Sequence, residues 1–123
     1  MFDRIVQMSL LFDFYGQLLT EKQQKVLQLY YGNDWSLGEI SEQEGVSRQA
    51  VYDHVKRAEK ILFEYEMKLG LVQKFISTQN QIREILKILE KLERKFLESY
   101  PKDESILEEF ENIKKITREL LEI

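Results

Sequence analysis

The sequence places two helix starts very close together, at Ser36 and Ser47. Ser36 is followed three residues later by Glu39, which is the pattern of a capping box at a helix N-terminus. Gly45 can end that helix in the left-handed conformation, and Ser47 can cap the next helix at once. The first helix therefore has room for only about eight residues. The pattern predicts two helices joined by a tight turn, a helix-turn-helix unit over residues 36–70.

The side chains around this turn suit two helices that cross at close range. Ser41 and Ala50 are small enough to permit contact, and Val46 can fill the angle between the helices. Gly70 is expected to end the second helix. The inner positions of that helix recur at spacings of three and four, the period of an amphipathic helix. They are Ala50, Val51, either His54 or Val55, Ala58, Ile61, Leu62, Tyr65 and Leu69.

Two further helices are expected before this unit. Segment 2–19 carries too many apolar residues for a single stripe, so we expect a helix that is nearly surrounded by protein. Thr20 and Gln23 form a second capping-box pattern, and the helix that they open should stop at residues 32–34. The inner side of that helix consists of Val26, Leu27, Leu29 and Tyr30.

The sequence beyond Gly70 predicts an antiparallel helical hairpin. A long amphipathic run is interrupted at Pro101, which lacks an amide hydrogen and disfavours helix at Tyr100. Asp103 can cap a final helix. Because two helices alone rarely bury enough surface to be stable, the apolar stripe of this hairpin needs a partner. The partner is either the N-terminal domain or a second copy of the chain.

The composition indicates an all-α protein. The 123 residues include five glycines and one proline, and helix-forming residues are frequent. We expect two parts, a helix-turn-helix domain over residues 1–70 and a hairpin over residues 71–123. The hairpin is expected to serve oligomerisation, as a homodimer.

Charge and apolar content narrow the possible functions. The chain has no cysteine, which excludes disulfides and thiolate metal sites. It has no apolar run of about 18 residues, and its first residues do not resemble a signal peptide, so we expect a cytoplasmic protein without membrane insertion. The net charge of −4 counts against tight binding to DNA, because phosphate neutralisation supplies much of the affinity.

The second helix of the helix-turn-helix unit would present its N-terminal half outward. Arg48 could pair with guanine and Gln49 with adenine, since these side chains can form two hydrogen bonds to the base edges. The hydroxyl of Ser47 and the cationic side chains further along the helix could hold phosphates. With the exposed tyrosine, the predicted nucleic-acid-binding residues are Ser47, Arg48, Gln49, Tyr52, Lys56 and Arg57.

An alternative interpretation treats these side chains as an ordinary solvated face of a structural module. From Ser36 to Gly70 there are five basic and seven acidic residues, a net charge of −2. The basic residues nevertheless gather on the second helix.

The sequence offers no catalytic or metal-binding constellation. His54 is the only histidine and has no cysteine to complete a ligand set, so we expect it in the core or facing the turn. Paired carboxylates such as Asp3 and Asp13 lack a nucleophile or a phosphate cradle beside them, and we expect neither an enzyme nor a cofactor. Several aromatic residues could stack RNA bases, but helical spacing favours a core role for most of them: Phe12, Phe14, Tyr15, Tyr30, Tyr31 and Trp35.

Segments of the predicted helices and of the helix-turn-helix unit resemble two known families. Residues 19–27 (LTEKQQKVL) and 46–51 (VSRQAV) are similar to region 4 of bacterial sigma factors, over about half the chain. The segments LLFDFYGQLLT (10–20), SLGEI (36–40) and SRQAVYD (47–53) together resemble the YlxM family of small helix-turn-helix proteins more closely.

These resemblances imply a function. By the sigma resemblance, Ser47, Arg48, Gln49 and Tyr52 would read DNA, although Tyr52 and Asp53 depart from the basic or amide residues common there. The YlxM resemblance implies a DNA-binding-like regulatory or accessory factor of the signal recognition particle pathway.

Two hypotheses follow. The first is a dimeric helix-turn-helix protein that binds DNA or RNA weakly or within a complex, with the hairpin supplying the dimer contact. The second is a protein-interaction module that contacts the GTPase of the signal recognition particle, or that GTPase with its RNA, without touching nucleic acid directly. The acidic balance favours the second, and the basic residues of the second helix favour the first.

Overall fold

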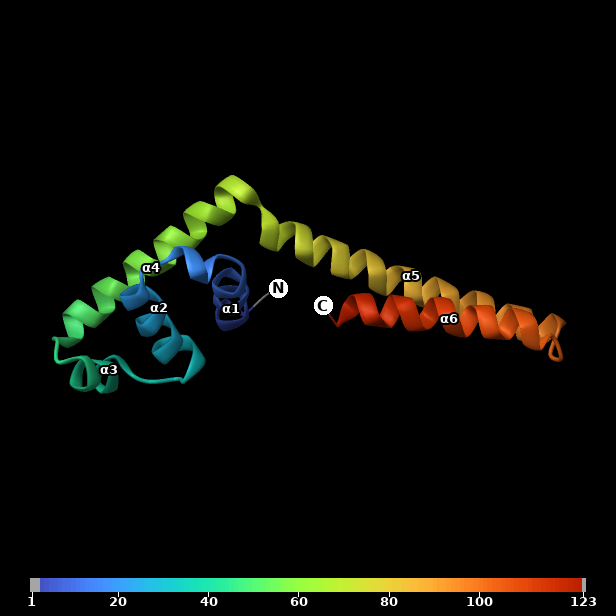
Figure 1. The fold of residues 1–123 in the computed structure, drawn as a ribbon, viewed down its shortest axis with the longest axis horizontal. Helices are drawn as coiled ribbons and strands as arrows, with labels where there is room; N and C mark the ends of the chain where they lie inside the picture. The colour runs from blue at the N-terminus through green and yellow to red at the C-terminus, as the bar shows by residue number, and fades with distance from the viewer. Residues whose placement is uncertain (1–2, 123) are drawn as a thin grey trace. The chain divides into compact units, whose positions relative to one another are not determined.

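The computed structural model describes residues 3–122, and within that range the chain forms helices and no strands (Figure 1). The all-α class predicted from the composition is therefore confirmed. The chain divides into two compact units, Met1–Val72 and Gln73–Ile123, which we call unit 1 and unit 2. In chain order the elements are α1 (Arg4–Tyr15), the 3-10 turn η1 (Gly16–Leu18), α2 (Glu21–Leu27), the π-helical turn η2 (Gln28–Gly32), α3 (Leu37–Glu44), α4 (Arg48–Leu69), α5 (Leu71–Ser99) and α6 (Glu104–Leu121).

Both predicted capping boxes are present. The Gln23 amide donates to the Thr20 hydroxyl at 3.2 Å, and the Thr20 amide donates to the Gln23 side chain at 3.0 Å. Ser36 and Glu39 make the same reciprocal pair at 3.1 and 3.3 Å. Each box satisfies amides that have no partner inside the helix, so α2 and α3 begin where the sequence predicts.

The turn between α3 and α4 also has the predicted chemistry. Gly45 adopts the left-handed conformation with φ of 68°, and its amide donates to the Ser41 carbonyl. Ser47 then accepts a hydrogen bond from the Ala50 amide at 3.1 Å and caps α4. Figure 1 shows the short connection between α3 and the start of α4. The helix-turn-helix predicted over residues 36–70 is confirmed.

Helix α4 is the centre of unit 1, because α1, α2 and α3 all pack against it. Its inner residues Val51, Val55, Ala58 and Leu62 are almost completely buried. The rest of the apolar core consists of Met8, Leu11, Tyr15, Leu19, Val26, Leu27, Ile40 and Val72.

Two expectations about burial are wrong. Helix α1 is not nearly surrounded, since Ile5 and Val6 are exposed and the buried residues form one stripe with Met8 and Leu11. Phe2, which opened the predicted segment, lies outside the described residues. Leu69 was expected on the inner side of α4, but it is 55% exposed. A helical period shows which apolar residues share one face of a helix, whereas burial requires that a neighbouring element covers that face.

The junction between α4 and α5 is built from side chains of unit 1. Gly70 ends α4 with φ of 62°, as predicted. The buried Tyr15 hydroxyl donates to the Glu66 carboxylate at 2.6 Å and accepts from the Leu71 amide at 3.1 Å. Glu66 also accepts from the Val72 amide at 3.0 Å. A carboxylate and a phenol therefore satisfy the first amides of α5, where no serine or threonine cap is available.

Unit 2 is an antiparallel hairpin of α5 and α6, as predicted. The turn contains Pro101, and the Asp103 carboxylate accepts from the Ile106 amide to cap α6. Lys114 on α6 reaches Glu93 on α5 at 2.8 Å, which fixes the register of the two helices. Across the described residues, no helix is long and apolar enough to cross a membrane.

Candidate nucleic-acid interface

The predicted reading residues lie between the N-cap of α4, Ser47, and the third turn of that helix. Its first two turns bury Val51 and Val55 against the core, so the opposite side faces solvent. All six predicted residues are exposed, namely Ser47, Arg48, Gln49, Tyr52, Lys56 and Arg57. We call this exposed set the α4 face; at about 100° per residue it spreads around the solvent-exposed part of the helix, with Arg57 about half a turn from Arg48.

Arg48 lies across the first turn of α3. A Cβ placed on Gly38 would stand 3.1 Å from the guanidinium nitrogens of Arg48, so glycine at this position leaves room for the arginine. The SLGEI segment therefore has a role beyond its capping box: its glycine lets the arginine lie close to the backbone of α3. Sequence reasoning included Arg48 but gave no role to Gly38.

The neighbouring polar side chains are already engaged. The Ser47 hydroxyl accepts the capping hydrogen bond from the Ala50 amide, although its own hydrogen is still available to a phosphate. The side-chain amide of Gln49 donates to the Asp53 carboxylate at 3.1 Å. Asp53 therefore holds Gln49 parallel to the helix, and the pair would have to separate before Gln49 could contact an adenine.

The cations of the α4 face differ in how freely they can bind phosphate. The Lys56 ammonium lies 5.5 Å from the ring centre of Tyr52 and 3.4 Å from the Glu59 carboxylate. Arg57 forms no ion pair with any described residue and is exposed. Arg57 is therefore more available for a phosphate than Lys56.

A buried carboxylate lies directly behind the α4 face. Glu59 is 3% exposed and accepts hydrogen bonds from the Tyr31 hydroxyl and, at 2.8 Å, from Arg4. With Lys56 these groups link α1, η2 and α4. Sequence reasoning missed this cluster. The signal was that Glu59 lies within the inner stripe of α4, between Val55 and Leu62.

Tyr31 is the member of this cluster whose ionisation is most altered. Burial and the hydrogen bond to Glu59 raise the pKa of Tyr31 from 10.0 to about 12, and the nearby Arg4 opposes this rise. A phenolate beside the Glu59 carboxylate would place two negative charges together. The neutral phenol is therefore the form that the fold stabilises.

The raised pKa predicts a pH dependence of stability. Because the pKa is higher in the folded chain, the contribution of Tyr31 is fully present below about pH 10 and is lost as the pH rises towards 12. In a spectrophotometric phenol titration, Tyr31→Phe should remove the step near pH 12. Tyr100→Phe in unit 2 is the control. If the step near pH 12 persists in Tyr31→Phe, another tyrosine carries it.

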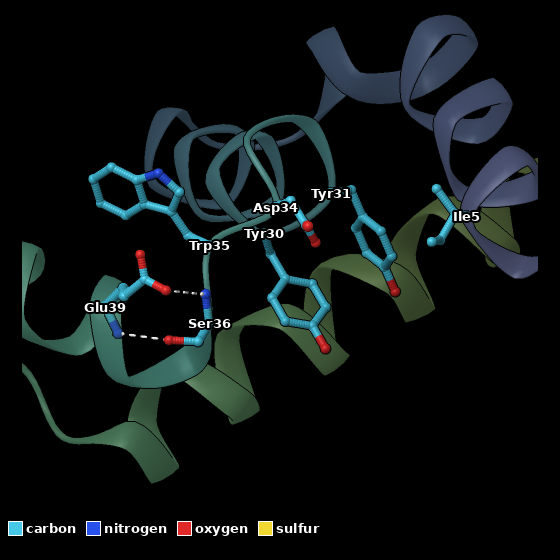
Figure 2. Close-up of a pocket in the computed structure, with 7 residues that line it drawn as sticks. All are labelled: Ile5, Tyr30, Tyr31, Asp34, Trp35, Ser36 and Glu39. Carbon is cyan, nitrogen blue, oxygen red and sulfur yellow. Dashed lines mark hydrogen bonds between the residues drawn. The ribbon is translucent and has the colours of Figure 1, made fainter.

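An aromatic pocket of about 350 Å³ lies beside α3. Figure 2 shows the rings of Tyr30 and Tyr31 beside one another and the indole of Trp35 on the opposite side of the loop. The charged residues that line it are Asp34 and Glu39, both acidic. An acidic lining opposes a phosphate backbone, so this pocket is not part of the candidate interface. Of the aromatic residues expected in the core, Tyr15 is buried, whereas these three are half-buried.

The remaining chemical candidate, His54, is half-buried on α4. The described residues contain no group of three or more histidine, aspartate, glutamate or cysteine side chains arranged to hold a metal ion.

The fold and the exposed α4 face define the class of this molecule as a small all-α helix-turn-helix protein. The chain belongs to the UPF0122 family, whose description reads "Putative helix-turn-helix protein, YlxM / p13 like" and whose model matches residues 2–95. The family resemblance drawn from the sequence is therefore confirmed. The description of the family thus names the same structural motif that the fold shows.

Individual relatives agree with this assignment. The chain is 50% identical over 91 residues to a UPF0122 protein of Acetivibrio thermocellus, covering 74% of this chain and 78% of that protein. It is 48% identical over 105 residues to one of Streptococcus pneumoniae, covering 85% and 86%. A third, from Desulforamulus reducens, is 54% identical over 84 residues, covering 68% and 72%.

Proposed function

We propose that this protein is a regulatory factor that binds duplex DNA through the α4 face. The observation that carries the proposal is the position of Arg48 and Gln49, exposed in the first turn of a recognition helix that two caps and Gly45 hold at a tight turn. In this motif the recognition helix enters the major groove, and its N-terminal residues contact base edges. In this proposal Ser47 and Arg57 contact phosphates.

Charge makes this binding weak for one copy. The helix-turn-helix unit has a net charge of −2, and Asp53 and Glu59 stand beside or behind the contact residues. We therefore propose that the chain acts as a homodimer. Two weak DNA contacts give a higher overall affinity when they are joined in one dimer, because the second contact forms at a high effective concentration. A cytoplasmic location follows from binding to DNA.

The salt dependence of binding tests the phosphate contacts. Arg57→Ala should lower the magnitude of the slope of log K against log salt concentration by about 0.9, because one fewer counterion is released. Lys68→Ala is the matched control, since Lys68 is an exposed cation at the opposite end of α4. Fluorescence anisotropy with a labelled duplex measures the slope. Equal slopes for the two variants would contradict the assignment of Arg57.

Base reading is tested separately. Arg48→Ala should reduce the preference for a selected site over random duplex by about 1–3 kcal/mol, without a comparable loss on random DNA. Site selection from a random pool supplies the duplex. If the unaltered chain binds no duplex at low salt, DNA binding through this face is wrong.

A second candidate function is supported by the acidic balance of the chain. Here the protein contacts the GTPase of the signal recognition particle, in keeping with the resemblance to the YlxM family, and acts as an accessory factor of that pathway. Pull-down of the purified GTPase, alone and with its RNA, after nuclease treatment separates the two candidates. Binding that survives both nuclease and the double variant Arg48→Ala/Gln49→Ala supports the protein contact. Binding that is lost with nuclease supports a nucleic-acid contact.

A further inference from the structure

Unit 2 carries a second apolar stripe that its own two helices do not cover. On α5 this stripe has the spacing of three and then four residues, and on α6 it has the same spacing. All six side chains are between 45% and 58% exposed, although each is a leucine or isoleucine. We call this set the outer stripe: Ile85, Ile88 and Leu92 on α5, and Ile113, Ile116 and Leu120 on α6.

The two halves of the outer stripe face the same side of the hairpin. Each member directly precedes a residue of the seam between the helices, as Leu92 precedes Glu93 on α5 and Ile113 precedes Lys114 on α6. A step of one residue turns about 100° around a helix axis. Because the helices are antiparallel, a backward step of one residue rotates in opposite directions on α5 and α6 when both are viewed from the same end of the hairpin. Starting from the seam, the two rotations therefore reach the same face of the hairpin.

This common face is large enough for a specific interface. The 18 residues of α6 extend for roughly 27 Å, and two helices side by side are roughly 20 Å wide. Two such faces together would bury roughly 1,100 Å², which exceeds the roughly 1,000 Å² expected of a biological interface. The 3–4 spacing is that of helices that pack in four-helix bundles.

The charges of the two helices select the partner helix. Helix α5 has six basic and four acidic side chains, a net charge of +2, whereas α6 has three basic and five acidic, a net charge of −2. A second copy of the same hairpin offers both charges. The most favourable pairing places α5 of one copy against α6 of the other.

We propose that the outer stripe binds the outer stripe of a second copy, forming a four-helix bundle with its two-fold axis parallel to the helices. This axis puts α5 over α6 of the partner, and the two run antiparallel, which also favours their helix dipoles. Since α5 continues the chain directly from unit 1, both helix-turn-helix units are attached to the same end of the bundle. The inference specifies the surface of the proposed homodimer and does not depend on DNA binding.

The oligomeric state of the full chain tests this surface. Ile88→Glu should raise the dimer dissociation constant by roughly 100-fold or more, because each dimer carries the substitution twice in an apolar interface. Met67→Glu is the matched control, since Met67 is an 86% exposed apolar residue of α4 in unit 1. Analytical ultracentrifugation gives the dissociation constants, and circular dichroism checks that helix content is unchanged. A second variant, Ile116→Gln, gives the same test without adding charge.

Several results would overturn the proposal. A monomeric unaltered chain across the micromolar range would do so, as would a dimer that Ile88→Glu and Ile116→Gln weaken no more than Met67→Glu. If the unaltered dimer binds no DNA but dissociates with the outer-stripe variants, the proposed function fails and the interface stands.

The orientation of the two copies is tested with cysteines, because the chain has none of its own. Leu92 and Ile116 lie at about the same level of the hairpin, given the ion pair from Lys114 to Glu93. Mixing Leu92→Cys with Ile116→Cys should yield an oxidised heterodimer. Neither variant alone should cross-link efficiently, since the proposed axis places equal residues diagonally. Cross-linking of Leu92→Cys with itself, and none in the mixture, would contradict the orientation.

Discussion

Replacing Leu62 by alanine is expected to lower the free energy of unfolding of unit 1 by about 2–5 kcal/mol. Leu62 is completely buried on α4, the helix against which α1, α2 and α3 pack. The cost combines the lost transfer free energy of the side chain with the cavity that remains. Urea unfolding of the full chain, followed through the fluorescence of Trp35, reports on unit 1 because the chain has a single tryptophan in that unit.

Leu69→Ala on the same helix is the control for this experiment. Leu69 is 55% exposed, so the same substitution should change the free energy of unfolding by less than about 0.5 kcal/mol. The two variants thus compare two leucines that the 3–4 pattern of α4 predicts as inner residues alike. Equal losses for the two variants would mean that Leu69 is buried in solution and that the end of α4 packs differently.

Replacing Glu59 by alanine is expected to lower the free energy of unfolding by about 1–3 kcal/mol. The change removes the acceptor of the Tyr31 hydroxyl and of Arg4, and it leaves the phenol without its partner. The loss stays below that of a fully buried ion pair because the Arg4 and Lys56 side chains are about half exposed and can be hydrated. Glu64→Ala, an exposed glutamate of the same helix, should have little effect.

The same substitution should raise affinity for DNA while it lowers stability. Glu59 holds the Lys56 ammonium at 3.4 Å and contributes a negative charge behind the α4 face. Without Glu59, Lys56 is free to bind a phosphate, so the salt slope should become steeper by up to about 0.9. Anisotropy titrations of Glu59→Ala and Glu64→Ala at matched salt concentrations measure the difference. A weaker or unchanged affinity for folded Glu59→Ala would show that Lys56 does not face the duplex.

The start and end points of most helices were predictable from short segments. A capping box needs only a serine or threonine and a side chain three residues further on, so Thr20 and Ser36 identified two helix starts. Gly45 and Gly70 marked two ends because a left-handed residue there favours glycine. The outward position of the α4 face followed from the same local period of 3.6 residues.

Contacts between distant segments were not predictable in this way. The sequence does not show that Arg48 lies over Gly38, or that Glu59 meets Arg4 across 55 residues. The prediction from the apolar pattern also overestimated the burial of α1 and Leu69, since an apolar residue is buried only where another helix covers it. For the candidate site, the six candidate residues were predicted from the sequence, but the structure was needed to identify Asp53 and Glu59 as competing partners of Gln49 and Lys56.

The sequence by itself determined the class, the helix-turn-helix, the hairpin and the residues of the α4 face, because capping, turn conformation and helical period depend on neighbours along the chain. Only the tertiary structure decided which cations of that face are free, which acids restrain the others and that the outer stripe lies on one common side. These properties depend on which side chains meet in space. The register set by Lys114 and Glu93, and the burial of Glu59 within α4, arise only when the helices pack.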